Sequence, residues 1–359
     1  MNTSFEHTKK FYDVFLKYPD DKKDYRLSLY IGLGIAVVVG IIVHLFIPKC
    51  KYYAPNYTGT TLYKVSPCEE GDNGVFTIEK GTKEIGLKAF YQCKKIKTVI
   101  LPQSLTTIAS EAFKECSNLE SIILPDSLTF IGADAFYSCI KLKTINIPLS
   151  VRTINNNPFS GCCLDVEVAL GHIKFYEQDG CLVDKTNMNL VSYTGNEEQP
   201  TIPGNVLIIG ESAFASHNKI KKIDMSGSCI REIRSFAFAD CNNIKSITFP
   251  DSLEYIGYNN PFIGIHYDNA ERVEINSNYV NDKGYLIDLR NKTLISYLGK
   301  ETTIKFYRLE NNIDSIGAFS LAWCNFILSF DNKRKPKYAE NAFFGCNDYI
   351  INQFNSIRR

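Results

Sequence analysis

Residues 131–151 read IGADAFYSCIKLKTINIPLSV, and the same pattern returns along the chain with a spacing of 23 residues. Ile85, Ile108, Ile131 and Ile154 follow this spacing, and the first three open the phrase Ile-(Gly/Ala)-x-x-Ala-Phe-x-x-Cys. Self-similarity at a fixed period of this size indicates one structural unit stacked many times. The period therefore predicts a solenoid, in which each repeat contacts only its neighbours.

The repeats align on a large apolar residue, usually phenylalanine. The aligned positions are Phe90, Phe113, Phe136, Phe159, Phe214, Phe238, Phe262, Leu321 and Phe343. Three residues further on lies Cys93, Cys116, Cys139, Cys162, Cys241, Cys324 or Cys346, with His217 and Ile265 as exceptions. Zinc sites favour cysteines two to four residues apart, and this spacing supplies none. We expect the repeat cysteines to be buried thiols that pack as small hydrophobic side chains.

Each unit divides into a strand and a turn. Leu119, Ile122 and Leu124 alternate with polar or outward positions, which predicts a short strand in a parallel sheet on the concave side. Pro125 ends this strand because it has no amide hydrogen for the ladder. The stretch 131–139 spaces its apolar residues as one face of a helix would, which predicts a short helical turn opposite the sheet.

A longer period is superimposed on the short one. The sequence NNPF at 156–159 recurs at 259–262, and GCLVDKTNMNLVSYTG from Gly180 returns as GYLIDLRNKTLISYLG from Gly284. In each copy two apolar runs flank a polar turn, which is a hairpin signal. The sequence predicts two β-hairpin inserts, near 172–203 and 275–305. We expect them to brace the stack, with a binding role as the alternative.

An uncharged apolar run precedes the repeats. Residues 27–47 read LSLYIGLGIAVVVGIIVHLFI, long enough as a helix to cross the roughly 30 Å hydrocarbon layer. A cleaved signal peptide would have a shorter apolar core and a small-residue cleavage site. Basic residues are more frequent before the run than after it, which places the amino end in the cytoplasm. We predict a type II, single-pass protein of the plasma membrane with extracellular repeats.

Together these features predict the organisation of the chain. The expected parts are a cytoplasmic tail at 1–26, a transmembrane helix at 27–48, a juxtamembrane linker and cap at 49–74, the repeat domain at 75–350 and a C-terminal tail at 351–359.

Composition and motifs argue against several functions. Lys plus Arg number 40 against 39 Asp plus Glu, so the chain shows no basic footprint for nucleic acid. No phosphate-binding loop, GxSxG or HExxH motif occurs. His172, His217 and His266 are isolated, and His217 fills a cysteine position where a packed core histidine is expected. We predict no enzyme activity, cofactor, metal or small-molecule substrate.

The repeat phrase resembles the BspA-like class of leucine-rich repeats, and residues 131–151 are close to its full consensus. The resemblance covers about residues 75–350. It implies a leucine-rich repeat solenoid in a family of cell-surface and secreted proteins linked to adhesion and to binding of host or matrix proteins. The predicted anchor departs from the secreted members and favours tethered display. The family's binding residues are poorly defined, so none is transferred to this chain.

The outward-facing strand positions are the candidate binding face for a protein or glycan ligand. Ile100 and Ile123 are expected to lie side by side as an exposed apolar pair, and apolar groups with a polar rim mark interaction sites. The alternative is an ordinary solvated sheet face. The candidates are Lys97, Thr98, Ile100, Glu120, Ser121, Ile123, Lys143, Thr144, Asn146, Lys221, Lys222, Asp224, Lys245, Ser246 and Thr248.

Three shorter signals lie outside this face. Tyr12-Asp-Val-Phe15 in the tail resembles an endocytic sorting signal. Two Asn-x-Thr sequences are candidate glycosylation sites. Cys50 and Cys68 are candidates to pair and lock the cap. The glycosylation candidates are Asn56 and Asn291.

Adhesion or recognition at a cell surface is the function that these observations favour. One alternative is a surface receptor that signals, or is internalised, through its short tail. Another is a scaffold that stays inside the secretory pathway.

Overall fold

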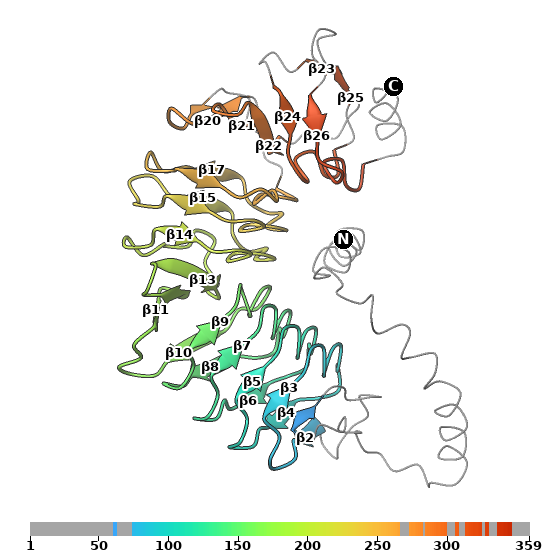
Figure 1. The fold of residues 1–359 in the computed structure, drawn as a ribbon, viewed down its shortest axis with the longest axis vertical. Coiled ribbons are helices and arrows are strands. Elements are labelled where there is room, and N and C mark those ends of the chain that lie inside the picture. The colour runs from blue at the N-terminus through green and yellow to red at the C-terminus, as the bar shows by residue number, and fades with distance from the viewer. Residues whose placement is uncertain are drawn as a thin grey trace, which may run out of the picture. The chain divides into compact units, whose positions relative to one another are not determined.

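The computed structural model describes residues 60–62, 74–265, 273–282, 284–299, 306–308, 313–324, 327–329 and 336–346. The chain divides into two units, 1–53 and 54–359, and every described residue belongs to the second. In this part the chain forms a solenoid of parallel strands, as the period predicted (Figure 1). No helix within the described ranges is long and apolar enough to cross a membrane, and the predicted helix at 27–48 lies outside them.

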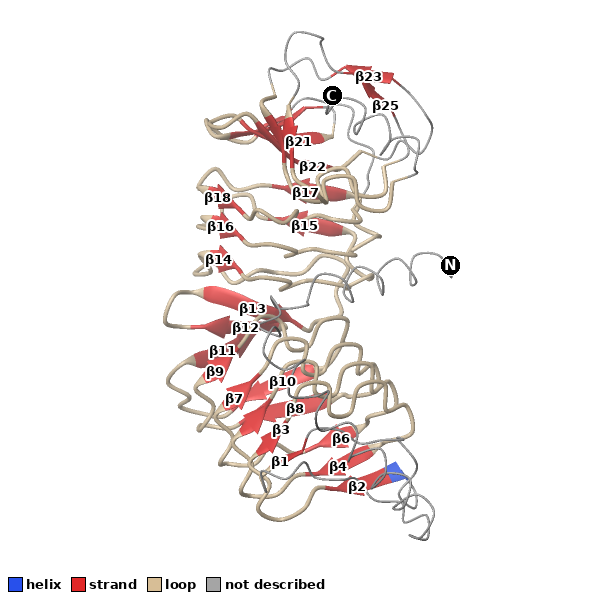
Figure 2. Cartoon of the chain, turned by 45° about the vertical axis from the view of Figure 1, so that its right-hand side comes forward, coloured by secondary structure: helices blue, strands red, loops and turns tan. Residues whose placement is uncertain are grey.

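Most coils contribute two short strands, one to each of two parallel ladders. Figure 2 shows β14, β16 and β18 stacked in one row and β15 and β17 in another. Ladder I is the row formed by two separate sheets. Before the first insert it contains β1 (Thr61–Leu62), β3 (Glu84–Ile85), β5 (Thr107–Ile108), β7 (Phe130–Ile131) and β9 (Thr153–Ile154), and after it β14 (Ile208–Ile209), β16 (Glu232–Ile233) and β18 (Tyr255–Ile256). Ladder II is the row formed by three short sheets. The first contains β2 (Val75–Thr77), β4 (Thr98–Ile100) and β6 (Ser121–Ile122), the second β8 (Thr144–Ile147) and β10 (Asp165–Val168), and the third β15 (Lys222–Asp224) and β17 (Ser246–Thr248).

Ladder II corresponds to the predicted sheet, whereas ladder I was not expected. Its strands begin one residue before the repeat isoleucine, and their register follows the sequence period, as in the pairing of Ile108 with Ile131. Ile108 and Ile131 are fully buried. The sequence predicts that they begin a helical turn. They are instead the inward residues of a second sheet.

The Ala-Phe stretch of each unit is a series of tight turns, which corrects the prediction of a helical turn. Asp134 and Ser138 both have a φ of 54°, a left-handed conformation that a right-handed helix cannot accommodate. The amides of residues 111–116 alternate between two kinds of partner. Those of Glu111, Phe113 and Glu115 donate to carbonyl oxygens of the next coil, and the intervening amides donate within their own coil. Half of the amides in this stretch thus hold neighbouring coils together.

Stacked phenylalanines form the centre of the core. Phe90 and Phe113 are fully buried, and their ring centroids lie 4.8 Å apart. The stack continues with Phe136, whose ring centroid lies 5.3 Å from that of Phe113. In the first insert Tyr193 takes the place of the phenylalanine and stacks on Phe214 at 5.0 Å. Stacked aromatic contacts add to the apolar burial that joins one coil to the next.

The repeat cysteine is a hydrogen-bond donor as well as a packed side chain. Cys116 Sγ donates to the carbonyl oxygen of Phe90 at 3.0 Å, and Cys139 Sγ donates to that of Phe113 at 3.2 Å. Burial raises the pKa of the Cys116 thiol to about 12, which keeps it protonated and unreactive. Alanine would leave the volume of the sulfur empty and would remove this donor from a buried carbonyl.

Cys93 departs from this pattern because it is disulfide-bonded, which corrects its interpretation as a free thiol. The other described cysteines are free. The partner of Cys93 is not among the described residues, and neither are Cys50 and Cys68, for which a disulfide was predicted.

The two predicted inserts are three-stranded antiparallel meanders rather than simple hairpins. The first contains β11 (Phe175–Gln178), β12 (Cys181–Asp184) and β13 (Asn189–Tyr193). The second contains β20 (Tyr279–Asp282), β21 (Tyr285–Asp288) and β22 (Thr293–Tyr297), and β19 (Val273–Glu274) pairs with β20 as a fourth antiparallel strand. β13 then pairs in parallel with β14, and β22 pairs with β24 (Ser315–Ile316). The last strand of each meander therefore continues ladder I. The remaining strands are β23 (Phe306–Arg308), β25 (Ile327–Ser329) and β26 (Lys337–Tyr338).

A buried asparagine from each NNPF motif links the coil before an insert to the coil after it. The Asn157 side-chain amide donates to the carbonyl oxygens of Ser212 at 2.8 Å and Ala213 at 3.0 Å. Its oxygen accepts from the Phe159 amide at 2.9 Å. Asn260 repeats the arrangement by donating to the Phe319 carbonyl at 3.1 Å. The motif thus supplies hydrogen bonds where the meander interrupts the regular stacking.

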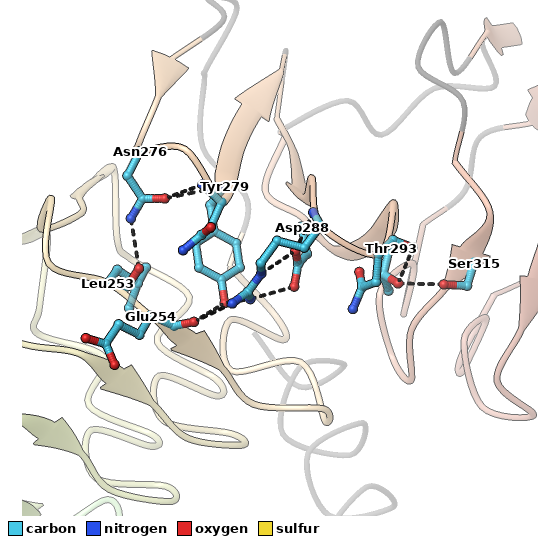
Figure 3. Close-up of polar contacts among 10 residues, drawn as sticks. Leu253, Glu254, Asn276, Tyr279, Asp288, Thr293 and Ser315 are labelled. Atoms are coloured by element: carbon cyan, nitrogen blue, oxygen red, sulfur yellow. Dashed lines mark hydrogen bonds and ion pairs between the residues drawn. The ribbon is translucent and has the colours of Figure 1, made fainter.

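The second meander is fixed to the preceding coil by a polar cluster (Figure 3). Tyr279 Oη and Arg290 Nη1 both donate to the carbonyl oxygen of Glu254, at 3.1 and 2.9 Å. Arg290 also pairs with Asp288 at 2.8 Å and lies over the Tyr279 ring. Asn276 Nδ2 donates to the Leu253 carbonyl at 2.8 Å. These contacts support a bracing role for the insert.

Candidate binding surface

Ladder II presents the predicted outward residues. Val99 and Ile122 are 2% and 5% exposed and face the core, so their strand neighbours point outward. None of the fifteen candidates is buried. The exposed ones are Lys97, Ile100, Glu120, Ser121, Ile123, Lys143, Thr144, Asn146, Lys221, Lys245 and Thr248. Thr98, Lys222, Asp224 and Ser246 are half-buried.

Two isoleucines form the apolar centre of this surface. Ile100 is 50% exposed and Ile123 is 80% exposed. The register of β4 and β6 pairs Val99 with Ile122, so Ile100 and Ile123 follow as neighbours on the outer side. Val75, which pairs with Thr98, adds a third exposed apolar side chain. We call Val75, Ile100 and Ile123 the isoleucine face.

Val75 was missed in the sequence analysis because it precedes the first complete repeat. The sequence signal that could have identified it is alternation along the strand: Val75 lies two residues before Thr77 and therefore points to the same, outer side.

Charged residues flank the isoleucine face with alternating sign. The amide of Glu120 donates to the carbonyl of Lys97, which places these two residues on adjacent coils, and Lys143 holds the equivalent position one repeat later. All three side chains are exposed. An exposed apolar centre with a charged rim is the usual composition of a protein interaction site.

The later part of ladder II has a different character. Lys222 pairs with Asp224 at 3.1 Å, and Lys221 pairs with Glu198. Hydrogen bonds from Ser226 and Lys222 hold the pKa of Asp224 at about 2. Exposed ion pairs of this kind contribute little free energy. The candidates at β15 and β17 are therefore polar, with ion pairs at β15, and the apolar candidates are Ile100 in β4 and Ile123 directly after β6.

A buried charge cluster lies on the turn side of the coils. Lys114 is 3% exposed and lies 3.1 Å from Glu111 and 3.4 Å from Asp134. Its ammonium group also lies 4.8 Å from the centre of the Tyr137 ring. Because the lysine lies between two carboxylates contributed by adjacent coils, we interpret the cluster as a structural link.

The two described histidines are buried at structural positions. Nδ1 of His172 accepts hydrogen bonds from the amides of Lys174 and Phe175, both at 3.1 Å. Asn276 does the same for the second meander, accepting from the amides of Asn278 and Tyr279. His172 thus shapes the turn into the first meander. Among the described residues no group of His, Cys, Asp and Glu could hold a metal ion.

His217 fills the cysteine position of its repeat. It is 4% exposed, its Nδ1 lies 3.2 Å from the Ala215 carbonyl oxygen, and its ring contacts Tyr193. Burial lowers the pKa of His217, because the charged imidazolium would lose its hydration.

Acidification is expected to destabilise the solenoid in part through His217. In the unfolded chain this histidine takes up a proton below about pH 6.5, whereas the folded protein resists protonation to lower pH, so stability falls as pH falls. The contribution is at most about 1.4 kcal/mol per pH unit. His217→Cys, which restores the repeat residue, is expected to make the unfolding free energy less steep between pH 7 and 5 in urea titrations. Equal slopes for the variant and the wild-type protein would contradict this role.

Of the predicted glycosylation and sorting residues, only Asn291 lies in the part of the chain that the structure describes. Asn291 is exposed in the turn between β21 and β22, where a glycan would meet no buried group. Tyr12, Phe15 and Asn56 lie outside the described residues. Glycosylation and sorting stay predictions.

Comparison with known families identifies the class of repeat. The profile of the BspA-type leucine-rich repeat region matches residues 73–177 and 184–281 in six copies. This chain belongs to the BspA-type leucine-rich repeat family. The resemblance inferred from the repeat phrase is thereby confirmed. No curated protein matches the chain.

Solved structures with a similar fold are bacterial leucine-rich repeat proteins. One from Eubacterium ventriosum is 18% identical with a TM-score of 0.46, and the match covers 76% of this chain and 82% of that chain. The pneumococcal vaccine antigen PcpA is 21% identical with a TM-score of 0.44, covering 83% and 89%. A leucine-rich cell surface protein from Faecalibacterium prausnitzii is 17% identical with a TM-score of 0.38, covering 84% and 74%.

Proposed function

We propose that this protein is a membrane-anchored surface protein whose isoleucine face binds a protein or glycan ligand without catalysing a reaction. The observation that carries the proposal is the pair Ile100 and Ile123, which are 50% and 80% exposed and adjacent on one sheet. Isolated apolar residues are common on surfaces, but adjacent ones with a charged rim favour an interface.

The ladder gives this face a fixed geometry. The inward residues Val99, Ile122 and Ile145 are 2%, 5% and 2% exposed, so the strands are packed from below. Backbone hydrogen bonds between coils hold the strands at a constant register. A ligand that binds such a preformed surface loses little free energy to ordering it.

Two observations support a location outside the cytosol. Cys93 is disulfide-bonded, and structural disulfides persist in oxidising compartments. The apolar run at 27–47, with more basic residues before it than after it, favours a cytoplasmic amino end.

A non-enzymatic role is supported by the residues that could otherwise act in catalysis. His172 and His217 are committed to buried structural positions, and burial lowers the pKa of each. The repeat thiols are buried and donate hydrogen bonds to backbone carbonyls.

The topology can be tested with the full chain carrying an amino-terminal tag. In intact cells we expect surface biotin and added protease to reach the repeats, while the tag stays protected. Asn291→Gln is expected to remove one glycan and to increase gel mobility, with the exposed turn residue Asn187→Gln as the matched control. Repeats that become accessible only after permeabilisation would overturn the proposed surface location.

A further inference from the structure

A second apolar surface lies at the corner where ladder II meets the first insert. Leu149, Leu170 and Ile173 are 53%, 99% and 74% exposed. We call these three residues the leucine corner. It is separate in sequence and in strand membership from the isoleucine face on β2, β4 and β6.

Two adjacent turns build the leucine corner. The Val151 amide donates to Pro148 at 3.1 Å, and the His172 amide donates to Ala169 at 3.0 Å, so each turn spans four residues. The strands that lead into them, β8 and β10, are paired in register with Ile147 opposite Val168. Leu149 and Leu170 therefore occupy the same position in neighbouring turns.

Other turns of the array carry a polar residue or glycine at this position. The same hydrogen bond closes the turns that begin at Pro102, Pro125, Pro203, Met225 and Pro250. The residues equivalent to Leu149 in those turns are Gln103, Asp126, Gly204, Ser226 and Asp251. The fold therefore does not require an apolar side chain there.

The second copy of the duplicated block provides an internal comparison. His172 and Asn276 accept equivalent backbone hydrogen bonds, which aligns the two copies at this point. The second copy carries polar residues at the two positions that match the leucine corner. Asp251 matches Leu149 in the turn that begins at the proline, and Ser277 matches Ile173 beside the aligned Asn276. Leu170 lies in a turn that has no counterpart of the same length in the second copy, where β19 (Val273–Glu274) ends just before Asn276. The apolar surface is thus a property of the first copy alone.

The corner is held rigidly despite its exposure. His172 fixes the turn through two backbone amides, and the Lys185 ammonium donates to the His172 carbonyl at 2.6 Å. Gly171 provides the left-handed residue of the turn with a φ of 81°. Leu170 and Ile173 are therefore presented on a defined backbone.

Positive charge surrounds the leucine corner. Arg152 and Lys185 are exposed, and both lie close enough to add to the effect of burial in lowering the pKa of His172. Lys174 is paired with Asp184 at 3.4 Å and adds no net charge. Two copies of this surface would repel each other, because each brings the same pair of cations.

We propose that the leucine corner docks into an apolar pocket of a partner protein whose rim carries carboxylates. Leu170 would enter the pocket, and Arg152 and Lys185 would pair with the rim. A lipid surface would need anionic headgroups for the same cations, and these concentrate in the cytoplasmic leaflet. The topology proposed above, on which this comparison rests, places the repeats on the opposite side.

The test uses a polar variant of the leucine corner, Leu149→Asp with Leu170→Glu and Ile173→Ser. The full chain, held in nanodiscs of neutral phosphatidylcholine, is used to select from a phage library of random peptides. Selected peptides are then measured by fluorescence anisotropy. The matched control is Ile140→Asp, which changes an apolar residue elsewhere on the array that is 57% exposed, close to the 53% of Leu149.

We expect selected peptides to combine bulky apolar residues with Asp or Glu, and the triple variant to bind them at least about tenfold more weakly. Arg152→Glu with Lys185→Glu is expected to have a similar effect, and the control is expected to have none. An unchanged thermal unfolding curve would show that the triple variant folds.

Three results would overturn the proposal. One is that no peptide distinguishes the wild-type protein from the triple variant. Another is that binding is insensitive to the charge-reversed pair. The third is that no peptide binds, whereas vesicles of phosphatidylcholine and phosphatidylserine bind the wild-type protein and not the triple variant. That result would identify a lipid surface as the ligand of the leucine corner. The isoleucine face is intact in every variant, so failure here leaves the proposed function unaffected.

Discussion

Replacing Asn157 by alanine is expected to lower the free energy of unfolding by about 3 to 5 kcal/mol. Asn157 is fully buried and donates to the carbonyl oxygens of Ser212 and Ala213. Alanine would leave the Phe159 amide and the Ser192 hydroxyl without their acceptor in a site closed to water. The two carbonyls would lose one donor each and keep the backbone amides of Ala215 and Tyr193. Each buried group left unsatisfied costs roughly 1 to 3 kcal/mol.

Urea unfolding followed by circular dichroism would measure this loss. Asn260→Ala is expected to behave in the same way, because Asn260 links the coils around the second insert. Asn196→Ala, at an exposed position, is the control and is expected to change stability by less than about 0.5 kcal/mol. A similar small change for Asn157→Ala would show that the coils on either side of the insert are held by other contacts.

The sequence predicted the stacking, the aromatic core positions and ladder II, because each depends on a pattern that is local to one repeat. It did not predict ladder I or the geometry of the turns. Apolar spacing in 131–139 fits a helical turn and a pair of β-turns equally well, since both bring Ala135 and Phe136 inward. The choice is decided by hydrogen bonds to the next coil, such as that from the Phe113 amide to Ala135.

Cys93 illustrates a second limit of local patterns. It occupies the same repeat position as Cys116 and Cys139, yet it is disulfide-bonded and they are free. Nothing in the repeat phrase distinguishes the three residues. The difference depends on a cysteine brought close by the fold, which spacing within a repeat does not reveal.

The outward orientation of the candidate residues followed from strand alternation, but their grouping into surfaces did not. Ile100 and Ile123 could be paired from the period, whereas Val75 required the observed pairing of β2 with β4. Leu149 departs from the polar residues that follow the other repeat prolines, and this departure was visible in the sequence. Its significance depends on Leu170, which only the pairing of β8 with β10 places beside it.

Replacing Ile100 and Ile123 together by aspartate is expected to weaken ligand binding by about 100-fold or more. The change removes the apolar centre of the isoleucine face and adds two charges that a bound partner would have to desolvate. Folding is expected to be preserved, since both side chains are exposed. Later positions of the same outward row, Asn146 and Glu167, already carry polar side chains.

The effect can be measured with cells that display the full chain, by counting how many adhere to host-cell or matrix surfaces. Surface biotinylation is used to compare cells that display equal amounts of each variant. Ile140→Asp is the matched control, because Ile140 is 57% exposed but lies in the turn after the repeat cysteine rather than on ladder II. The isoleucine face predicts loss of adhesion in the double variant and full adhesion in the control. If both variants adhere as the wild-type protein does, the ligand binds elsewhere, and ladder II is an ordinary solvated sheet.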